Sequence, residues 1–390
     1  MPYSGLIITG TSGAGKSTLV ERLETAGPGF VHVKAVTTRP PRPDDPAEAY
    51  EHLSREAFAR LGHEDKLLVR TRYRGEDYGI RRQAVDDVQA SGRHPLLTLT
   101  ADSAADLVRS TASADGQYLS LFIDAPDEEL DRRLATRSVK MPPEQSLIQR
   151  REDRSFREKS TYCIINHSID DVVRLTQWLW RSAGAGGMLP AHIIKLMLRV
   201  GVLLENSHMD SVEGASYDLR LGDEYYYGGR IHRLSDADPI LFVQPYDYAI
   251  VTSHEEANMP GDVSGRFDLA VNLFCQGIIL SNGPQVDPGF RGTLFCLLFN
   301  TSSSPVLLKR RQHYATIEFH KLIEPTYQYR GKYHAKSLLD YLPPNAAQGA
   351  INELKRELES VRKESQTLQN VTWAILSLIL AMIALWTSLK

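Results

Sequence analysis

The sequence is poor in cysteine and has no excess of charge of one sign. Its 390 residues include only three cysteines, Cys163, Cys275 and Cys296, and no CxxC pair. Scattered cysteines of this kind indicate reduced thiols in a cytosolic setting rather than a disulfide framework. The twelve histidines lack the spacing of metal ligands, so no structural metal is expected. The net charge of −3 provides no strong field that would attract nucleic acid, and no nucleic-acid partner is expected.

Long hydrophobic runs are missing from the first 370 residues. The first apolar run, Leu6–Ile8, is too short for a secretory leader. Hydrophobic residues nevertheless make up 42% of the chain, which is enough to build packed cores. The length predicts two or three domains.

The most informative stretch lies at residues 10–17, which read GTSGAGKS. It follows an apolar run that predicts a buried strand, and it precedes a helical pattern that starts at Ser17. The order strand, GxxxxGK[ST], helix is typical of a phosphate-binding loop. Glycines let backbone N–H groups point at phosphate oxygens, and the helix N-terminus adds its positive dipole end. The alternative is an ordinary glycine-rich turn between a strand and a helix.

This motif assigns roles to single residues and predicts ATP and Mg²⁺ as cofactors. Lys16 would reach the β- and γ-phosphates and act in catalysis, and the Ser17 hydroxyl would bind Mg²⁺. The residues expected to contact the nucleotide are Gly10, Ser12, Gly13, Ala14, Gly15, Lys16, Ser17 and Thr18.

Residues 1–182 alternate between short apolar segments and amphipathic segments. The expected strands are Gly5–Ile8, Val31–Ala35, His94–Leu99, Leu119–Ile123 and Tyr162–Ile165. The expected helices are Ser17–Ala26, Ser54–Gly62, Arg81–Ala90, Ala105–Ala112, Asp127–Arg137, Pro143–Lys159 and Ile169–Ala183. The alternation predicts an α/β fold, with a parallel sheet that carries helices on both faces.

Several short motifs follow one another in this region in a specific order. They are Gly10–Leu19, Val36–Pro43, Tyr50 with Ser54–Phe58, Tyr78 with Gly79, Phe122–Pro126, the arginine-rich segment Arg132–Arg151, and Ile165 with Asn166. With these motifs the segment resembles the guanylate kinase family across its whole length. The resemblance implies transfer of the γ-phosphoryl group of ATP to a phosphorylated acceptor.

The resemblance also implies which side chains hold the acceptor phosphate. They are Arg39, Arg42, Tyr50 and Tyr78. Arginine offers a planar fork of donors to a dianion, and tyrosine hydroxyls bind its remaining sides.

Arginines of the predicted lid would neutralise the charge that develops between donor and acceptor. The candidates are Arg133, Arg137 and one of Arg150 or Arg151, and Arg150 is taken here as the catalytic one. The alternative for each of them is a solvated surface charge.

The positions expected to recognise guanine depart from the family pattern. A serine, a glutamate, an aspartate and a threonine of the family correspond here to Ala35, Val69, Thr100 and Ile80. Valine and threonine cannot pair with the N1–H and amino group of guanine as carboxylates do, so discrimination for guanine is lost. The expected acceptor is therefore not GMP but a sugar phosphate or a non-guanine nucleotide. A third interpretation is that ATP is bound without being turned over.

Residues 183–187 are small and predict a flexible linker to a second domain over 188–335. One helix is expected there at Pro190–Val202. The expected strands are Tyr217–Leu221, Glu224–Tyr227, Pro239–Phe242, Tyr248–Ser253, Gly265–Leu269, Gly277–Ser281, Thr293–Asn300, Val306–Leu308 and Tyr314–His320. Short strands at this spacing predict an all-β sandwich or barrel.

Three motifs of this second domain resemble the dCTP deaminase and dUTPase family. They are Ser216–Gly222, Met259-Pro260 with Gly265-Arg266, and Asp287–Gly292. The resemblance implies a jelly-roll-like fold that assembles as a homotrimer with nucleotide sites between subunits.

The catalytic pattern of that family is missing. The Arg-Ser-Ser turn that binds triphosphate corresponds to Ala270–Asn272, and the general-base glutamate corresponds to Leu297. The chain therefore lacks the hydrogen-bond donors that would bind a triphosphate and the base that would activate water. The favoured interpretation is an inactive domain kept for assembly or ligand sensing, in which Asp218 and Asp287 serve packing or turns. A catalytically active deaminase or dUTPase would need another carboxylate in place of Leu297.

Residues 346–370 predict a short coiled coil. Apolar residues recur at spacings of three and four at Ile351, Leu354, Leu358, Val361 and Leu368, with the polar Ser365 between them. A trimeric coiled coil would suit the trimer implied upstream, and the alternative is an amphipathic helix packed on the domain.

Residues 371–389 predict a membrane-spanning helix. These nineteen residues carry no charge, and Trp373 and Trp386 lie near their ends. The alternative, a buried core helix, would need a large partner domain. Lys and Arg residues on the N-terminal side favour a single-pass C-terminal tail anchor that keeps the folded domains in the cytoplasm.

Together these observations predict a membrane-anchored ATP-dependent kinase that acts on a nucleotide or a sugar phosphate. The alternative is a nucleotide-responsive membrane effector, for example in defence against phage, in which a ligand reorganises the anchors.

Overall fold

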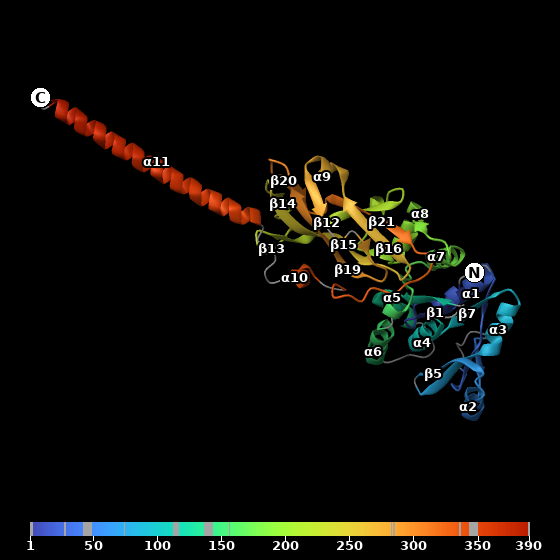
Figure 1. Cartoon of the computed structure of the whole chain (residues 1–390). Helices are drawn as coiled ribbons and strands as arrows, with labels where there is room; N and C mark the ends of the chain where they lie inside the picture. The colour runs from blue at the N-terminus through green and yellow to red at the C-terminus, as the bar shows by residue number, and fades with distance from the viewer. Residues whose placement is uncertain are drawn as a thin grey trace.

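The computed structural model shows two folded domains and one long projecting helix (Figure 1). It describes residues 3–26, 29–41, 49–73, 75–111, 117–135, 143–155, 157–281, 283, 285–334, 337–342 and 350–388. The α/β region (blue to teal) comes first in the chain, the β-rich region (green to orange) follows, and the helix extends from it.

The first domain is built on a five-stranded parallel sheet, as the alternating pattern predicts. The strand order is β2 (Phe30–His32), β7 (His94–Thr98), β1 (Tyr3–Gly10), β8 (Gln117–Asp124) and β9 (Tyr162–Ile165). The central strands are buried and rich in Leu and Ile, which is typical of a parallel sheet covered on both faces. The associated helices are α1 (Lys16–Ala26), α3 (Arg82–Ala90), α4 (Ala101–Thr111), α5 (Asp127–Ala135), α6 (Pro143–Arg154) and α7 (Ile169–Arg181).

A second, smaller sheet in this domain is absent from the sequence prediction. Its order is β4 (Tyr50–His52), β3 (Ala35–Thr37), β6 (Glu76–Arg81) and β5 (Leu67–Tyr73), and α2 (Arg55–His63) packs near it. The single strand predicted at Val31–Ala35 is wrong, because the chain leaves the main sheet after His32 and joins the small sheet at Ala35. Two of these strands have only three residues, too few to show a two-residue periodicity.

The predicted helix Pro143–Lys159 is also too long. Helix α6 ends at Arg154, and a separate 3₁₀ turn, η1, covers Arg157–Lys159 before β9 begins. The predicted helix Asp127–Arg137 corresponds to α5, which ends at Ala135, and residues 136 and 137 lie outside the described part of the chain.

The second domain is an antiparallel β half-barrel, whereas the resemblance implied a jelly-roll-like fold. One large sheet has the order β17, β19, β15, β12, β21, β16, β18, and β14 pairs with β20 apart from it. The strands are β10 (Gly187–Met188), β11 (Leu203–Glu205), β12 (Ser216–Tyr227), β13 (Arg230–Arg233), β14 (Ile240–Val243), β15 (Tyr248–Asn258), β16 (Val263–Leu269), β17 (Ile278–Ser281), β18 (Gln285–Val286), β19 (Arg291–Asn300), β20 (Val306–Lys309) and β21 (His313–Lys321). The helical elements are α8 (Ala191–Arg199), η2 (Met209–Ser211), α9 (Val271–Cys275) and α10 (Leu338–Tyr341).

Strand β12 merges two strands that the sequence separates at Gly222. A side chain at this position would place its Cβ 2.4 Å from the Thr252 hydroxyl oxygen of the neighbouring strand. The glycine therefore permits close approach of two strands instead of marking a turn.

The segment predicted to be a flexible linker is held in place. The Lys321 ammonium donates to the carbonyl oxygens of Ser182 (3.2 Å) and Ala185 (3.4 Å), and Gly187 pairs with Lys321 in the β10–β21 ladder. The segment therefore packs against β21 and is not a flexible linker.

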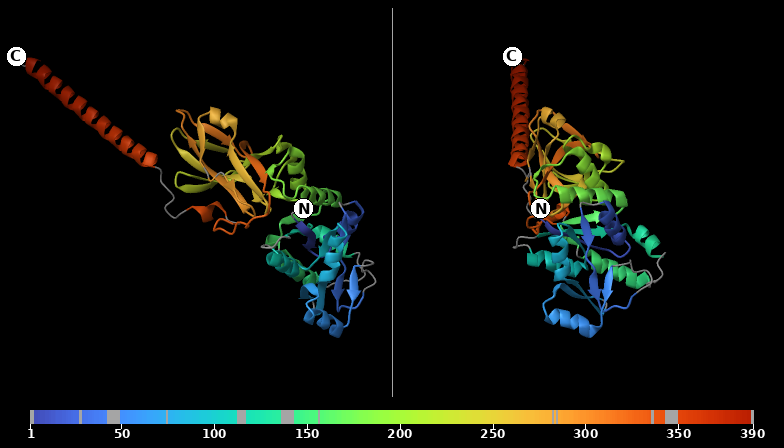
Figure 2. Two further views of the ribbon diagram at one scale, coloured as in Figure 1. Left: turned by 45° about the vertical axis from the view of Figure 1, so that its right-hand side comes forward. Right: turned by 90° about the vertical axis from the view of Figure 1, so that its right-hand side faces the viewer.

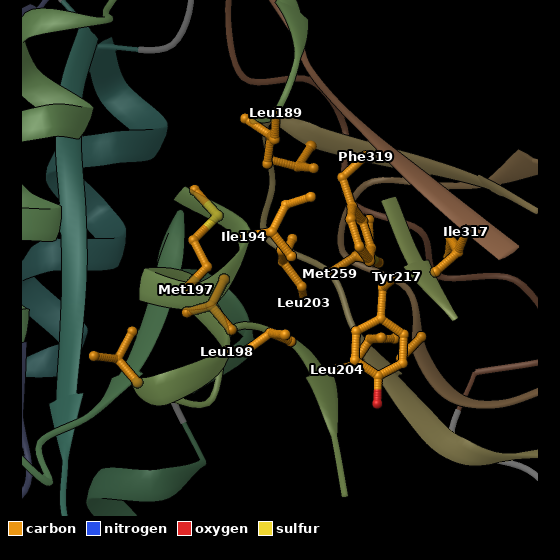
Figure 3. Packing of buried hydrophobic residues seen from close by; sticks show 14 of the residues in the cluster. Leu189, Ile194, Met197, Leu198, Leu203, Leu204, Tyr217, Met259, Ile317 and Phe319 are labelled. Carbon is orange, nitrogen blue, oxygen red and sulfur yellow. The ribbon is translucent and has the colours of Figure 1, made fainter. Parts of the chain in front are cut away.

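The two domains share one hydrophobic core. A single cluster of buried side chains runs from the first strand of the first domain to β21 of the second. Helix α8 lies at the boundary, where Ile194, Met197 and Leu198 are buried (Figure 3). Strand β9 lies at the edge of the five-stranded sheet and is hydrogen-bonded to the second domain. The Ile165 N–H donates to the Val200 carbonyl oxygen at 2.8 Å. The second domain thereby covers an edge that would otherwise be open.

The C-terminal region forms one helix, α11 (Ala350–Ser388), of 39 residues. It projects away from both domains in every view (Figures 1 and 2). Every residue of α11 from 357 to 383 is exposed, and the helix runs without a break through the described parts of the segments predicted as coiled coil and membrane span. Its segment Glu357–Ile383 contains an 18-residue window with a mean hydropathy of 1.4, long and apolar enough to cross a membrane, which by itself is weak evidence for an anchor.

Candidate functional site

The glycine-rich stretch forms a loop between the C-terminal end of β1 and the N-terminus of α1. Gly10 ends the strand, residues 11–15 form the turn, and Lys16, Ser17 and Thr18 open the helix. Gly10, Gly13 and Gly15 all have positive φ, at 135°, 88° and 96°. A Cβ on Gly10 would lie 2.0 Å from the Ile123 carbonyl oxygen, so only glycine fits there.

The geometry of the loop fits a nucleotide phosphate. The first N–H groups of α1 have no acceptor within their own helix, and they point out of its N-terminus. The Lys16 ammonium lies over the loop and donates to the carbonyl oxygens of Gly10 (2.7 Å) and Thr11 (2.9 Å). Ser17 and Thr18 are exposed beside it. The loop can therefore bind phosphate through backbone donors and Lys16.

The described residues contain no group of three or more His, Cys, Asp or Glu side chains that could hold a metal ion. The Ser17 hydroxyl, exposed at the start of α1, is the side chain that would hold Mg²⁺ together with phosphate oxygens of the nucleotide. When bound, it would neutralise charge on the phosphates.

A buried carboxylate below the loop was missed in the sequence. Asp124, at the end of β8, is 2% exposed and accepts a hydrogen bond from the Thr11 hydroxyl at 2.5 Å. Arg154 of α6 donates to the same carboxylate at 2.9 Å. The loop and the lid helix therefore meet on one side chain. Adjacent parallel strands, β1 and β8, place Thr11 beside Asp124, a relation that no local pattern reveals.

The structure distinguishes the two lid candidates Arg150 and Arg151. Arg150 is buried and forms ion pairs with Asp131 and, at 3.5 Å, with Asp127 of α5, whereas Arg151 is exposed. Arg150 thus fastens α6 to α5 in this arrangement. The guanidinium groups of Arg154 and Arg150 together hold the pKa of Asp127 below its usual range, chiefly through the hydrogen bond from Arg154.

Arg133 is the described lid candidate that approaches the phosphate loop. Its guanidinium lies 3.4 Å from the Gly13 carbonyl oxygen and pairs with Glu129 at 2.9 Å. Hydrogen bonds from Arg132 and then Arg133 lower the pKa of Glu129. Arg137 lies outside the described residues.

Three of the four residues expected to hold the acceptor phosphate lie at the small sheet, Tyr50 and Tyr78 on its strands and Arg39 just after β3. The Arg39 guanidinium carbon lies 5.1 Å from the centre of the Tyr50 ring, and Tyr78 on β6 pairs with Thr37, two residues before Arg39. Helix α6 reaches this sheet because the Gln149 amide contacts the Tyr73 hydroxyl, and the Tyr73 ring lies 6.3 Å from that of Tyr78. The fourth residue, Arg42, lies outside the described residues.

Three of the four positions expected to read a guanine base belong to a buried apolar cluster. Ala35 pairs with Ile80 across β3 and β6, and Val69 pairs with the same Ile80 across β5 and β6. Val69 and Ile80 are buried in one hydrophobic cluster, against which Ala35 packs. Thr100 bonds locally to the Ser103 hydroxyl at 2.8 Å. None of these four side chains offers a carboxylate to a base.

In the second domain, the positions that depart from the deaminase pattern, and the two aspartates of its motifs, have structural roles. Leu297 lies in the middle of β19, where it pairs with Ile250 and Ser281. Ala270 caps the short helix α9, with Val271 exposed beside it. Asp218 accepts from Thr316 and lies 3.2 Å from His313. Asp287 accepts a hydrogen bond from the Gln285 amide in the turn before β19.

Comparison with known proteins divides the chain into two parts. A guanylate kinase family model matches residues 3–181, and a dCTP deaminase-like model matches residues 188–322. A guanylate kinase of Parasynechococcus marenigrum is 33% identical over 171 residues, which is 43% of this chain and 92% of that protein. A dCTP deaminase of Thermococcus gammatolerans is 35% identical over 133 residues, which is 34% of this chain and 83% of that protein.

One solved structure aligns with the first part of the chain. A guanylate kinase from Anaplasma phagocytophilum aligns with a TM-score of 0.37 and 22% identity, over 47% of this chain and 87% of that one. These matches cover different halves of the sequence. Residues 3–181 of this chain therefore belong to the guanylate kinase family, and residues 188–322 belong to the dCTP deaminase-like family.

Proposed function

We propose that this protein is a membrane-anchored, ATP-dependent kinase that phosphorylates a phosphorylated small molecule other than GMP. One observation carries the proposal. The side chains suited to phosphate, Tyr50 and Tyr78 on the small sheet and Arg39 just after its strand β3, lie near positions where the family pattern has polar groups for guanine and this chain has the apolar core residues Ala35, Val69 and Ile80. Such a site holds the phosphate of an acceptor but offers no carboxylate to guanine.

In this proposal each charged residue has a separate task. Lys16 and the loop amides bind the phosphates of ATP, and Arg39 holds the acceptor phosphate. Arg133 lies beside the loop, where positive charge would stabilise the transferring group. Arg154 positions the lid by holding Asp124, and Arg150 does so by holding α5. The acceptor is a sugar phosphate or a non-guanine nucleotide.

The second domain serves assembly or ligand sensing in this proposal, not deamination. Leu297 cannot activate water, and Ala270–Asn272 carries no guanidinium for a triphosphate. Phe242 and Leu307 are cross-strand neighbours and are 48% and 51% exposed, and Phe274 is 68% exposed on α9. Exposed apolar side chains of this size support burial against further copies of the chain, as in a homotrimer.

Helix α11 is proposed to supply the membrane anchor through residues 371–389 and a coiled coil through 346–370. Leu376, Ile379 and Leu380 are exposed, and nothing else in the described chain covers them. A helix whose apolar residues face outward on all sides has no stable place in water. The folded domains would then lie on the cytoplasmic side.

The test is phosphoryl transfer by the full chain in detergent micelles. Labelled ATP is offered with nucleoside monophosphates, including GMP, and with ribose phosphates. We expect transfer to one acceptor, abolished in Lys16→Ala and kept in the surface control Lys309→Ala. GMP should react at least about 100-fold less efficiently than the best acceptor. ATP binding without transfer to any member of the panel would contradict the kinase proposal.

A second function is favoured by the way the parts are joined. The two nucleotide-related domains share one core, and the second continues into an exposed apolar helix. A ligand that changes the arrangement of these domains could therefore reorganise the membrane helices, as in a nucleotide-responsive membrane effector. Deletion of residues 371–390 separates the two functions. A kinase keeps its transfer activity in solution, whereas an effector loses its effect on cells.

A further inference from the structure

A cleft of about 410 Å³ lies at the boundary between the two domains, apart from the phosphate-binding loop. One wall comes from the segment Ser155–Cys163 of the first domain. The other comes from Met259, Arg291 and the chain that follows β21, around Tyr329 and Arg330. The volume falls within the range of small-molecule sites in proteins. Neither family model spans both walls, because one match ends at 181 and the other begins at 188.

The charged residues that line the cleft are all positive. Lys159, Arg291 and Arg330 all line it, and none of its described lining residues is an Asp or a Glu. Over the described chain the guanidinium groups of Arg291 and Arg330 make no ion pair and no hydrogen bond. Two such arginines in one concave site favour an anionic ligand. Arginine in particular binds phosphate with two parallel hydrogen bonds.

An aromatic surface lies next to these cations. Tyr329 lines the cleft, and its ring packs edge-on against Phe290 with centroids 5.5 Å apart. The centre of the His334 ring lies 6.5 Å from the centre of the Tyr329 ring. The Tyr329 backbone is fixed by a 2.8 Å hydrogen bond to the Pro288 oxygen. A fixed aromatic ring in the same cleft as two arginines provides a stacking surface for a base and donors for a phosphate.

The position of the cleft connects it to the lid. Its lining residues Ser155, Lys159 and Ser160 lie between the end of helix α6 and the start of strand β9. The Gln328 amide donates to the Ser160 carbonyl oxygen at 3.0 Å, so the two walls are already joined at one point. A ligand that bridges Lys159 and Arg291 would hold the base of the lid helix against the second domain.

We propose that this interdomain cleft is a binding site for a nucleoside phosphate. Arg291 and Arg330, with Lys159, bind the phosphate groups, and the Tyr329 ring packs against the base. The site is separate from the phosphate-binding loop and requires no phosphoryl transfer, so it stands whether or not the protein is a kinase.

The test measures binding by calorimetry to the full chain in detergent micelles. All measurements use a Lys16→Ala background, so that binding at the glycine-rich loop is weakened and transfer is abolished. The probes are the common nucleoside di- and triphosphates, inorganic pyrophosphate and the nucleosides. The variants are the Arg291→Ala/Arg330→Ala double variant and Tyr329→Ala. The matched control is Arg230→Ala, an exposed arginine in the hairpin of β12 and β13. Thermal unfolding checks that each variant folds.

We expect at least one nucleoside phosphate to bind the Lys16→Ala protein with a stoichiometry of one per chain. The double arginine variant should weaken it by at least about tenfold, and the Arg230→Ala control should leave it unchanged. Tyr329→Ala should weaken the nucleotide but not pyrophosphate.

Three results would overturn the proposal. The first is that no nucleotide binds once Lys16 is replaced. The second is that a folded double arginine variant keeps full affinity. The third is that pyrophosphate binds as tightly as any nucleotide and Tyr329→Ala has no effect, which would make the cleft an inorganic anion site.

Discussion

The Tyr162 hydroxyl donates a hydrogen bond to the Asp262 carboxylate across the boundary between the two domains. Both side chains are fully or almost fully buried, and the Lys321 ammonium lies 3.6 Å from the same carboxylate. A buried carboxylate needs such partners because its desolvation is costly. The kinase-family domain and the deaminase-like domain are therefore joined by a polar contact inside a common core, not only by a linker.

Replacement of Tyr162 by Phe is expected to lower the free energy of unfolding by about 1–3 kcal/mol, because Asp262 would lose a buried donor. Chemical denaturation of the full chain in detergent measures the change. Tyr327→Phe is the matched control, since Tyr327 is 99% exposed and should change little. Equal stability of the two variants would contradict a structural role for the contact.

The stability of the interface should depend on pH through Asp262. Burial raises the pKa of this carboxyl group above its usual value, although Tyr162 and Lys321 act in the opposite direction. The folded state therefore binds the proton more tightly than the unfolded state. The contribution of this group is present below the ordinary carboxyl pKa and is lost as pH rises through the raised value. The difference in unfolding free energy between the wild type and Asp262→Asn should accordingly grow in favour of the wild type from pH 7 to pH 4. A difference that is constant with pH, or that shrinks, would contradict this assignment.

Arg154 is expected to act on phosphoryl transfer as a positioning residue. Arg154→Ala removes the ion pair that ties α6 to Asp124, and through Asp124 to Thr11 of the loop. A misplaced lid should reduce kcat by up to about 100-fold while ATP binding changes less. Arg151→Ala, on the exposed face of the same helix, is the control. The prediction fails if both variants retain wild-type kcat.

Gly10→Ala should destabilise the first domain and weaken ATP binding. The added Cβ would collide with the Ile123 carbonyl oxygen at a φ of +135°, a combination that the backbone must move to accommodate. A loss of about 2 kcal/mol or more is expected. Gly214→Ala, where a Cβ meets nothing within 4 Å, should be nearly neutral. Thermal unfolding and ATP titration of both variants would show the contrast.

A charge placed in α11 tests the membrane anchor. Leu378→Arg puts a guanidinium near the middle of the apolar segment, at a cost of about 2.5–3.5 kcal/mol for a membrane helix. The variant should shift from the carbonate-resistant membrane fraction toward the soluble fraction. Ser360→Arg, in the polar half of the helix, should not shift. Wild-type protein that is fully extracted by carbonate would rule out the anchor.

The sequence by itself determined the features that depend on neighbouring residues. The loop at residues 10–17 is recognisable because its glycines, Lys16 and Ser17 are contiguous, and the apolar segment of α11 is recognisable because its length and lack of charge are local properties. The motifs of both families likewise lie in order along the chain. The parallel sheet followed from alternating periodicity, and the comparisons support both family assignments.

Only the tertiary structure decided how these parts are joined. Thr11 and Asp124 are 113 residues apart, and Tyr162 and Asp262 are 100 residues apart. Residues so distant meet through strand order and domain docking, which local periodicity does not encode. The short strands β3 and β4, the packing of Ala35, Val69 and Ile80 in one buried cluster, and the cationic cleft at the domain boundary have the same origin. Each depends on which segments pack together, because burial and charge convergence are properties of the folded surface and not of any one segment.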